Sequence, residues 1–129
     1  MKIAISTLGN TLESEIDPRF GRCQNFIIVE TINLSYEVIV NEAQSDGHGA
    51  GLRASQNIIN KGVNAVISGS VGPNAFEVLK ASNIEIYTAT GKILDAIKKL
   101  QNGSLPILSQ PQKIGGGRNQ GGGMGRGRS

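Results

Sequence analysis

The side chains best suited to binding a metal ion are the only cysteine and the only histidine of the chain, Cys23 and His48. Thiolate sulfur and imidazole nitrogen together suit iron and the softer transition metals. One cysteine and one histidine cannot complete a four-ligand structural site, so a second subunit or a preassembled cofactor would have to supply the remaining ligands. The alternative interpretation is structural, with Cys23 half-buried at the start of a strand and His48 in a mobile loop.

Two arginines near Cys23 could bind an anion. Arg19 and Arg22 belong to the segment 17–23, in which Asp-Pro favours a turn and Gly21 permits an unusual φ angle. Arg22 offers a fork of hydrogen-bond donors to an anionic ligand, and its charge would favour the thiolate form of Cys23. An ordinary surface turn is the structural alternative for the same residues.

Glycine-rich turns precede two predicted helices. Asp46-Gly47-His48-Gly49-Ala50-Gly51 opens the first helix, and Ser68-Gly69-Ser70-Val71-Gly72-Pro73-Asn74 joins a predicted strand to the second. Ligands of open α/β sheets bind beyond the carboxyl ends of the strands, where backbone N–H groups and helix N-termini point outward. The predicted binding residues are therefore Arg19, Arg22, Cys23, His48, Gly49, Gly69, Gly72 and Asn74. The second turn lacks the ending of a P-loop and the spacing of a dinucleotide fingerprint, so nucleotide binding is weakly supported.

Catalytic chemistry is not indicated by these residues. A nuclease of the ribonuclease-H type needs several carboxylates on its central strands to hold two metal ions, and the predicted strands 2–6 and 65–68 contain no Asp or Glu. The serines near these strands have one histidine as a potential base and no Gly-x-Ser-x-Gly motif. We therefore predict a binding protein and no enzyme.

The elements that must position these residues follow the order β-β-β-α-β-α-β-α. Apolar patterning predicts strands at 2–6, 25–31, 36–41, 65–68 and 85–87, and helices at 51–61, from Pro73 onward, and at 92–100. Gly62 and Gly103 are placed to end the first and last helices, and Leu52, Ser55, Ile58 and Ile59 form the predicted inner face of the first. The simplest arrangement is a five-stranded mixed α/β sheet of the ribonuclease-H-like kind, with the first and fourth strands adjacent and parallel.

Composition divides the chain into a folded domain at 1–110 and a Gly/Arg-rich tail at 111–129, which we expect to be disordered. Four of the 13 basic residues and eight of the 18 glycines lie from residue 113 onward, where no acidic residue occurs. The net charge of +3 therefore belongs to the tail, and the domain is nearly neutral. A single cysteine fits a reducing cytoplasm, and we expect neither a signal peptide nor a membrane span, because no apolar run is long enough.

The sequence resembles the dinitrogenase iron–molybdenum cofactor biosynthesis family, also called nitrogenase accessory factor-like, over roughly residues 1–105. The motifs that carry the resemblance are Met1-Lys2-Ile3-Ala4-Ile5, Phe20-Gly21-Arg22 followed by Asn25-Phe26, Gly47-His48-Gly49-Ala50-Gly51, Gly62-Val63-Asn64-Ala65-Val66-Ile67, Gly72-Pro73-Asn74-Ala75-Phe76 and Ile84-Glu85-Ile86-Tyr87. Many members carry His immediately before Phe-Gly-Arg, where this chain has Arg19. The resemblance implies a ribonuclease-H-like fold that binds iron–sulfur or iron–molybdenum cofactor precursors and passes them on.

The leading hypothesis is a non-catalytic carrier in metal-cluster biosynthesis, which binds its cluster transiently and exchanges it with donor and acceptor proteins as a monomer or homodimer. The residues expected to bond a metal directly are Cys23 and His48. Two alternatives remain open at this point. One is a nucleic-acid-associated protein that makes a weak contact through the basic tail. The other is a small-anion sensor that acts through a partner.

Overall fold

The predicted order of strands and helices is confirmed by the computed structural model, which describes residues 1–45, 47 and 49–110. The elements are β1 (Lys2–Thr7), β2 (Asn25–Glu30), β3 (Tyr36–Val40), α1 (Ala50–Asn60), β4 (Ala65–Ser68), α2 (Pro73–Ala81), β5 (Glu85–Thr88) and α3 (Ile93–Gln101). The predicted boundaries differ from these by at most one residue. The predicted tail at 111–129 lies outside the described residues.

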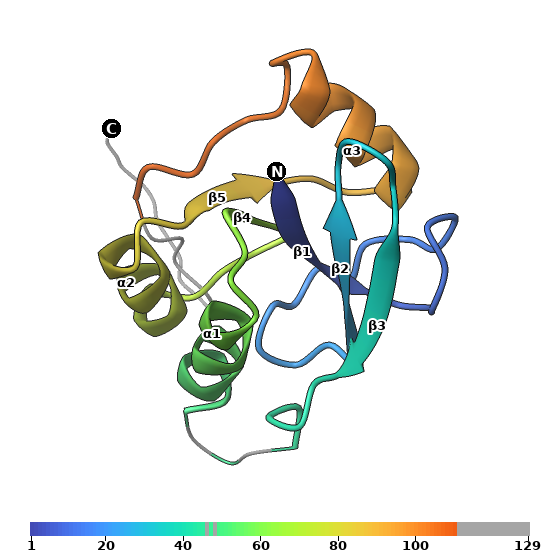
Figure 1. Ribbon diagram of the computed structural model, residues 1–129. Coiled ribbons are helices and arrows are strands. Elements are labelled where there is room, and N and C mark those ends of the chain that lie inside the picture. The colour runs from blue at the N-terminus through green and yellow to red at the C-terminus, as the bar shows by residue number, and fades with distance from the viewer. Residues whose placement is uncertain (46, 48, 111–129) are drawn as a thin grey trace, which may run out of the picture.

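The five strands form one mixed sheet in the order β3-β2-β1-β4-β5 (Figure 1). β1 pairs antiparallel with β2 and parallel with β4, so the expected adjacency of the first and fourth strands is confirmed. β3 extends the sheet antiparallel to β2, and β5 extends it parallel to β4. This topology is compatible with the ribonuclease-H-like arrangement. The carboxyl ends of β1, β4 and β5 consequently meet at one edge of the sheet.

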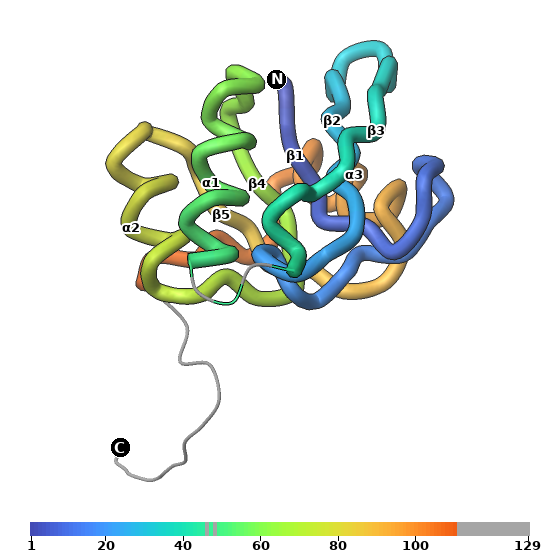
Figure 2. Tube along the Cα trace, turned by 90° about the horizontal axis from the view of Figure 1, so that it is seen from below, coloured from blue at the N-terminus to red at the C-terminus, as the bar shows by residue number. Residues whose placement is uncertain are grey.

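The sheet is covered by α1 and α2 on one face and by α3 on the other (Figure 2). β1 and β4 are buried on both faces, because their side chains alternate between two apolar clusters. Ala4 and Val66 pack toward α1 and α2, whereas Ile5 and Ile67 pack toward α3. The central strands thus read as continuous apolar runs in the sequence, as is typical of parallel strands covered on both faces.

Glycine and proline set the ends of the helices as the sequence predicted. Gly62 follows α1 with φ +72° and Gly103 follows α3 with φ +77°, both in the left-handed region that favours glycine. Pro73 occupies the first turn of α2. The prediction for Leu52 was wrong, since this side chain is 38% exposed while Ser55 and Ile58 are buried. No helix among the described residues is long and apolar enough to cross a membrane.

Candidate functional site

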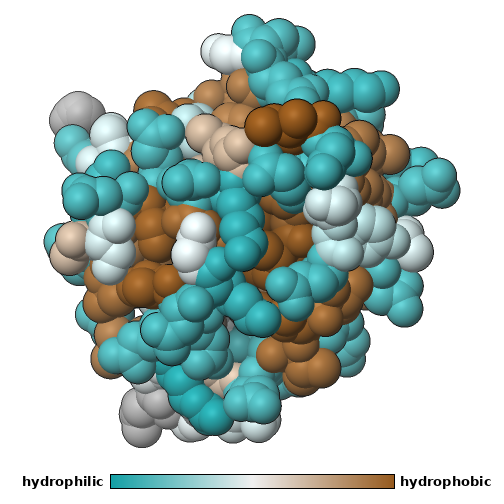
Figure 3. Space-filling view, in the orientation of Figure 1, coloured by the Kyte–Doolittle hydropathy of each residue, from teal (hydrophilic) through white to brown (hydrophobic). Residues whose placement is uncertain are grey.

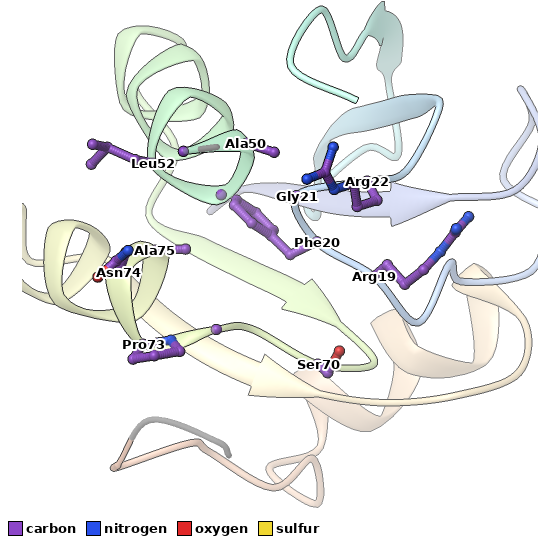
Figure 4. A pocket seen from close by; sticks show the side chains of 13 residues that line it. Arg19, Phe20, Gly21, Arg22, Ala50, Leu52, Ser70, Pro73, Asn74 and Ala75 are labelled. Carbon is purple, nitrogen blue, oxygen red and sulfur yellow. The ribbon is translucent and has the colours of Figure 1, made fainter. Parts of the chain in front are cut away.

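A cleft of about 400 Å³ lies where three loops meet at the carboxyl edge of the sheet. One wall comes from the loop that precedes β2, the second from the first turn of α1, and the third from the β4–α2 turn with the start of α2 (Figure 4). Its lining residues are Arg19, Phe20, Gly21, Arg22, Gly49, Ala50, Gly51, Leu52, Ser70, Gly72, Pro73, Asn74 and Ala75. The structure therefore brings together the three segments that the sequence singled out.

Serine hydroxyl groups at and just after the ends of β1 and β4 hold the loop that precedes β2 against the β4–α2 turn. The Ser70 hydroxyl donates to the Pro18 carbonyl over 2.6 Å, and the Ser70 carbonyl accepts from the backbone N–H of Phe20 over 3.3 Å. The buried Ser6 hydroxyl lies 2.7 Å from the Asp17 carbonyl oxygen and 2.8 Å from the Ser68 hydroxyl. The Ser70–Pro18 contact joins residues 52 apart in sequence, and the Ser6–Ser68 contact joins residues 62 apart, so the cleft depends on the complete sheet.

Two glycines allow the cleft walls to approach each other. A Cβ atom on Gly69 would lie 2.5 Å from the Cα atom of Pro18, and a Cβ atom on Gly21 would lie 2.9 Å from the backbone nitrogen of Gly51. The expectation that Gly21 serves an unusual φ angle was wrong, because its φ is not in the left-handed region. Both glycines are needed for close backbone packing, a requirement that the sequence alone does not reveal.

Two helix N-termini supply hydrogen-bond donors to the cleft. The first intrahelical bonds run from Arg53 N–H to the Gly49 carbonyl and from Phe76 N–H to the Gly72 carbonyl, each over 2.9 Å. The N–H groups that precede them have no partner within the helix. None of the described side chains caps either helix, and neither helix has an acidic residue in its first turn. Among the described residues, no side chain thus offsets the positive ends of the two helix dipoles.

The two predicted arginines have different environments. Arg19 is tied to the buried Asp17 carboxylate by Nε at 3.2 Å and by Nη2 at 3.3 Å, and this pairing raises the pKa of the Arg19 guanidinium. Figure 4 shows the Arg19 side chain directed away from the start of α2. Arg22 is exposed, and its Nη1 donates to the Gln44 carbonyl over 3.0 Å. The described lining residues include these two arginines and no Asp or Glu, and the carboxylate of Asp17 pairs with Arg19.

Cys23 is fully buried and does not line the cleft. Its sulfur contacts the Phe20 carbonyl at 3.4 Å and lies 3.8 Å from the amide nitrogen of Asn41. Burial, and secondarily the nearby Asp17 carboxylate, raises the pKa of the Cys23 thiol to about 12. The expected stabilisation of its thiolate by Arg22 was therefore wrong, because burial of the thiol has the largest effect on its pKa.

We expect Cys23 to resist alkylation in the folded protein. At roughly pH 8 a thiol with this pKa is almost entirely protonated, and the nucleophile is the thiolate. Because the unfolded thiol has a pKa of roughly 8.5, burial of the neutral thiol stabilises the fold below that pH, and this stabilisation is lost as the pH rises toward 12. Iodoacetamide labelling followed by mass spectrometry should show slow modification that becomes fast in denaturant. Fast labelling of the native chain would contradict the prediction.

The eight predicted binding residues divide into three groups by their place relative to the cleft. Arg19, Arg22, Gly49, Gly72 and Asn74 line the cleft, whereas Cys23 and Gly69 lie behind it. His48 lies outside the described residues, so its pairing with Cys23 stays a prediction. Among the described residues, no three His, Cys, Asp or Glu side chains gather as a metal site.

Sequence reasoning missed two contributors to this site. Leu52 was assigned to the core but lies at the cleft mouth, and its position in the first turn after a glycine-rich segment was the available signal. Asn41 holds the first wall, because its side-chain amide donates to the carbonyls of Gly21 at 3.1 Å and Cys23 at 2.9 Å. A single asparagine after a strand carries no sequence signal for that role.

Comparisons with known proteins agree with this architecture. The family model described as dinitrogenase iron-molybdenum cofactor matches residues 1–103. An uncharacterized protein of Methanocaldococcus jannaschii is 40% identical over 103 residues, which cover 78% of this chain and 84% of that protein.

Solved structures show the same fold. The apo form of the orange protein from Desulfovibrio gigas superposes with a TM-score of 0.83 at 31% identity, covering 87% of this chain and 96% of that one. A Thermotoga protein determined by NMR superposes with a TM-score of 0.76 at 36% identity, covering 88% and 98% of the two chains. The similarity extends over nearly all of the described residues.

Proposed function

The chain belongs to the dinitrogenase iron-molybdenum cofactor family, and on this premise we propose that it is a non-catalytic carrier of an anionic metal–sulfur cluster. The cargo is an iron–sulfur or iron–molybdenum-type cluster, or its precursor, and the binding site is the cleft between the three loops. The family supports the class of cargo. The apo form described for the relative from Desulfovibrio gigas adds support, since "apo" denotes a protein without its bound group.

The observation that carries the proposal is the charge distribution of the cleft. Arg22 stands at one wall, the starts of α1 and α2, which no described side chain caps, form the other two, and no described lining residue is acidic. Clusters built from iron, molybdenum and sulfide commonly carry net negative charge, which arginine and helix N-termini balance. The apolar surfaces of Leu52, Pro73 and Ala75 complete the cleft, and they suit a polarizable sulfide surface.

The donor set fits a preassembled cluster better than a bare metal ion. The one thiol of the chain is buried and protonated, and no group of three metal-ligating side chains occurs among the described residues. A cluster that arrives with its metal ions already ligated needs charge balance and hydrogen bonds from the protein. Such a site releases its cargo readily, because few metal–protein bonds must break. Direct ligation by Cys23 or His48 stays a prediction and would require Cys23 to become exposed.

In this role the chain binds and releases the cluster and catalyses no reaction. Its partners are a protein that donates the cluster and a protein that accepts it. The compartment is a reducing cytoplasm, in which a single free cysteine persists as a thiol. The arginines of the tail, on which the nucleic-acid alternative depended, lie outside the described residues.

The test is anaerobic loading of the full chain with clusters preassembled from iron and sulfide in a small thiol, with and without molybdate, and with molybdate alone. After desalting, metal content and visible absorption report the bound cluster. We expect stoichiometric retention of a coloured species, and its transfer to an apo iron–sulfur protein, after which the spectrum becomes that of the acceptor's own cluster. Retention of molybdate alone, detected as a thermal shift, would instead support the small-anion sensor. No retention of any of these probes would overturn the carrier proposal.

Arg22→Gln is expected to weaken retention of the loaded cluster by roughly ten- to hundredfold, because one charge-assisted hydrogen bond contributes about 1.5–3 kcal/mol. Arg53→Gln is the matched control. Arg53 is exposed on α1 beside Glu42, at 3.7 Å, and does not line the cleft. Cluster loss would be followed by absorption during dilution. Equal loss in both variants would show that general charge, and not the cleft, determines retention.

A further inference from the structure

Exposed apolar side chains concentrate on β3 and the turn before it. Five of the nine large exposed hydrophobic side chains in the described part of the chain are Ile32, Leu34, Tyr36, Val38 and Val40. Their exposed fractions are 85%, 38%, 44%, 37% and 66%. In Figure 3, hydrophobic residues reach the surface between polar ones on the side of the molecule where β3 lies. An apolar group of this extent on a small domain marks an interaction surface.

Three of these residues share one face of β3. Tyr36, Val38 and Val40 alternate along the strand, so their side chains point to the same side of the sheet. Val38 pairs with Ile27 and Tyr36 pairs with Val29, two β2 residues that belong to the apolar cluster beneath α3. The cluster therefore continues past β2 onto β3, where these side chains remain exposed.

The same three residues also carry the unpaired backbone groups of the sheet edge. Backbone hydrogen bonds run from Glu30 N–H to the Ser35 carbonyl and from Asn41 N–H to the Gln24 carbonyl. In the register of this strand pair, the N–H and C=O groups of the odd-numbered residues from 35 to 41 therefore point toward β2. In an antiparallel ladder the direction alternates at each residue, which turns the N–H and C=O groups of residues 36, 38 and 40 toward the open edge. β3 is the end strand of the sheet, and no described strand pairs with that edge. Such an edge is a template for another strand.

We propose that β3 pairs with β3 of a second copy of this chain, antiparallel and about a two-fold axis at Val38. This register sets Tyr36 opposite Val40 of the other copy and Val38 opposite its counterpart. All three outward-facing residues of each strand then form hydrogen-bonded pairs, and the exposed apolar faces meet side by side. Aromatic–β-branched pairs of this kind are favourable across antiparallel strands.

Charge and side-chain pairing favour the register centred on Val38 over those centred on Glu37 and Ile39. Centring the pair on Glu37 would set two carboxylates opposite each other, which is unfavourable. Centring it on Ile39 would leave Tyr36 without an outward-facing partner among the residues of β3. With Val38 at the axis, Glu37 lies opposite Ile39 and keeps its 3.5 Å ion pair with Lys61 of its own chain. In this register the strand is therefore complementary to its own copy.

The interface is small, so the dimer should be reversible. One strand pair buries less than the roughly 1,600 Å² of a standard interface. Sedimentation velocity of the full chain across a hundredfold range of concentration should show a shift from monomer to dimer. Val38→Lys places a charge on the axis and should keep the chain monomeric throughout. The matched control is Leu8→Lys, at another exposed apolar position, which should dimerise as the wild type does.

A monomer at every concentration would overturn the proposal, as would a dimer that Val38→Lys leaves intact. Circular dichroism would verify that the variants are folded, which is expected because both side chains project into solvent.

Disulfide trapping tests the register itself. Hydrogen-bonded antiparallel partners have Cα atoms about 5.5 Å apart, within the range that a disulfide spans. Val38→Cys should therefore form a covalent dimer under mild oxidation, whereas Glu37→Cys and Ile39→Cys should form much less. Cys23 provides the background rate, since it is buried in every variant. Preferential trapping at residue 37 or 39 would overturn the proposed register.

Discussion

Asn74→Asp is expected to lower retention of the anionic cluster by at least about tenfold while leaving the fold intact. Asn74 is exposed in the first turn of α2 and lines the cleft. Two like charges about 5 Å apart repel by roughly 3 kcal/mol at an effective dielectric constant near 20, and salt reduces this value. The same carboxylate is favourable to α2, because an acid near a helix N-terminus stabilises the helix by about 0.3–1 kcal/mol.

Binding and stability should therefore change in opposite directions. Cluster retention would be measured by absorption after dilution, and the free energy of unfolding by urea titration. Asn10→Asp is the control, since it makes the same charge change at an exposed residue away from the cleft. If Asn74→Asp retained the cluster as well as Asn10→Asp does, the cargo would not lie at the start of α2.

Gly69→Ala should produce the largest loss of stability among these substitutions. The new Cβ atom would lie 2.5 Å from the Cα atom of Pro18, and a backbone atom cannot move aside as the end of a flexible side chain can. Overpacking of this kind costs about 1–3 kcal/mol. For a domain of this size the melting temperature should fall by roughly 10 °C. The β4–α2 turn must also separate from the loop before β2, so cluster retention should weaken as well.

Gly47→Ala is the control for this prediction. A Cβ atom at Gly47 would meet no atom within 4 Å, and its φ is not in the left-handed region. We expect an unchanged melting temperature, or a slight rise because alanine restricts the unfolded chain. Differential scanning calorimetry would measure both variants. Equal melting temperatures for Gly69→Ala and Gly47→Ala would show that the Pro18 contact is not restrictive.

Local patterns carried most of the information on the fold. Alternating and continuous apolar runs specify strands and helices, and glycine or proline marks their ends, as at Gly62 and Pro73. The parallel pairing of β1 with β4 followed from the order of elements, because α1 provides the crossover between the two halves of the sheet. The ends of the elements depend on neighbouring residues, and the strand pairing follows from the order of elements. A single sequence therefore suffices to predict both.

The sequence by itself thus determined the order of elements, the mixed sheet and the three loops that form the cleft. It did not determine how individual side chains in those loops are used. Cys23 and Arg22 are adjacent in sequence, yet Cys23 is buried and Arg22 is exposed. Their adjacency therefore led to a wrong prediction of the protonation state of the thiol. Gly69 is restricted by Pro18, Arg19 is tied to Asp17, and the apolar side chains of β3 are exposed beside the buried strand β2. Each of these outcomes depends on desolvation or contact between distant segments, and only the tertiary structure decides them.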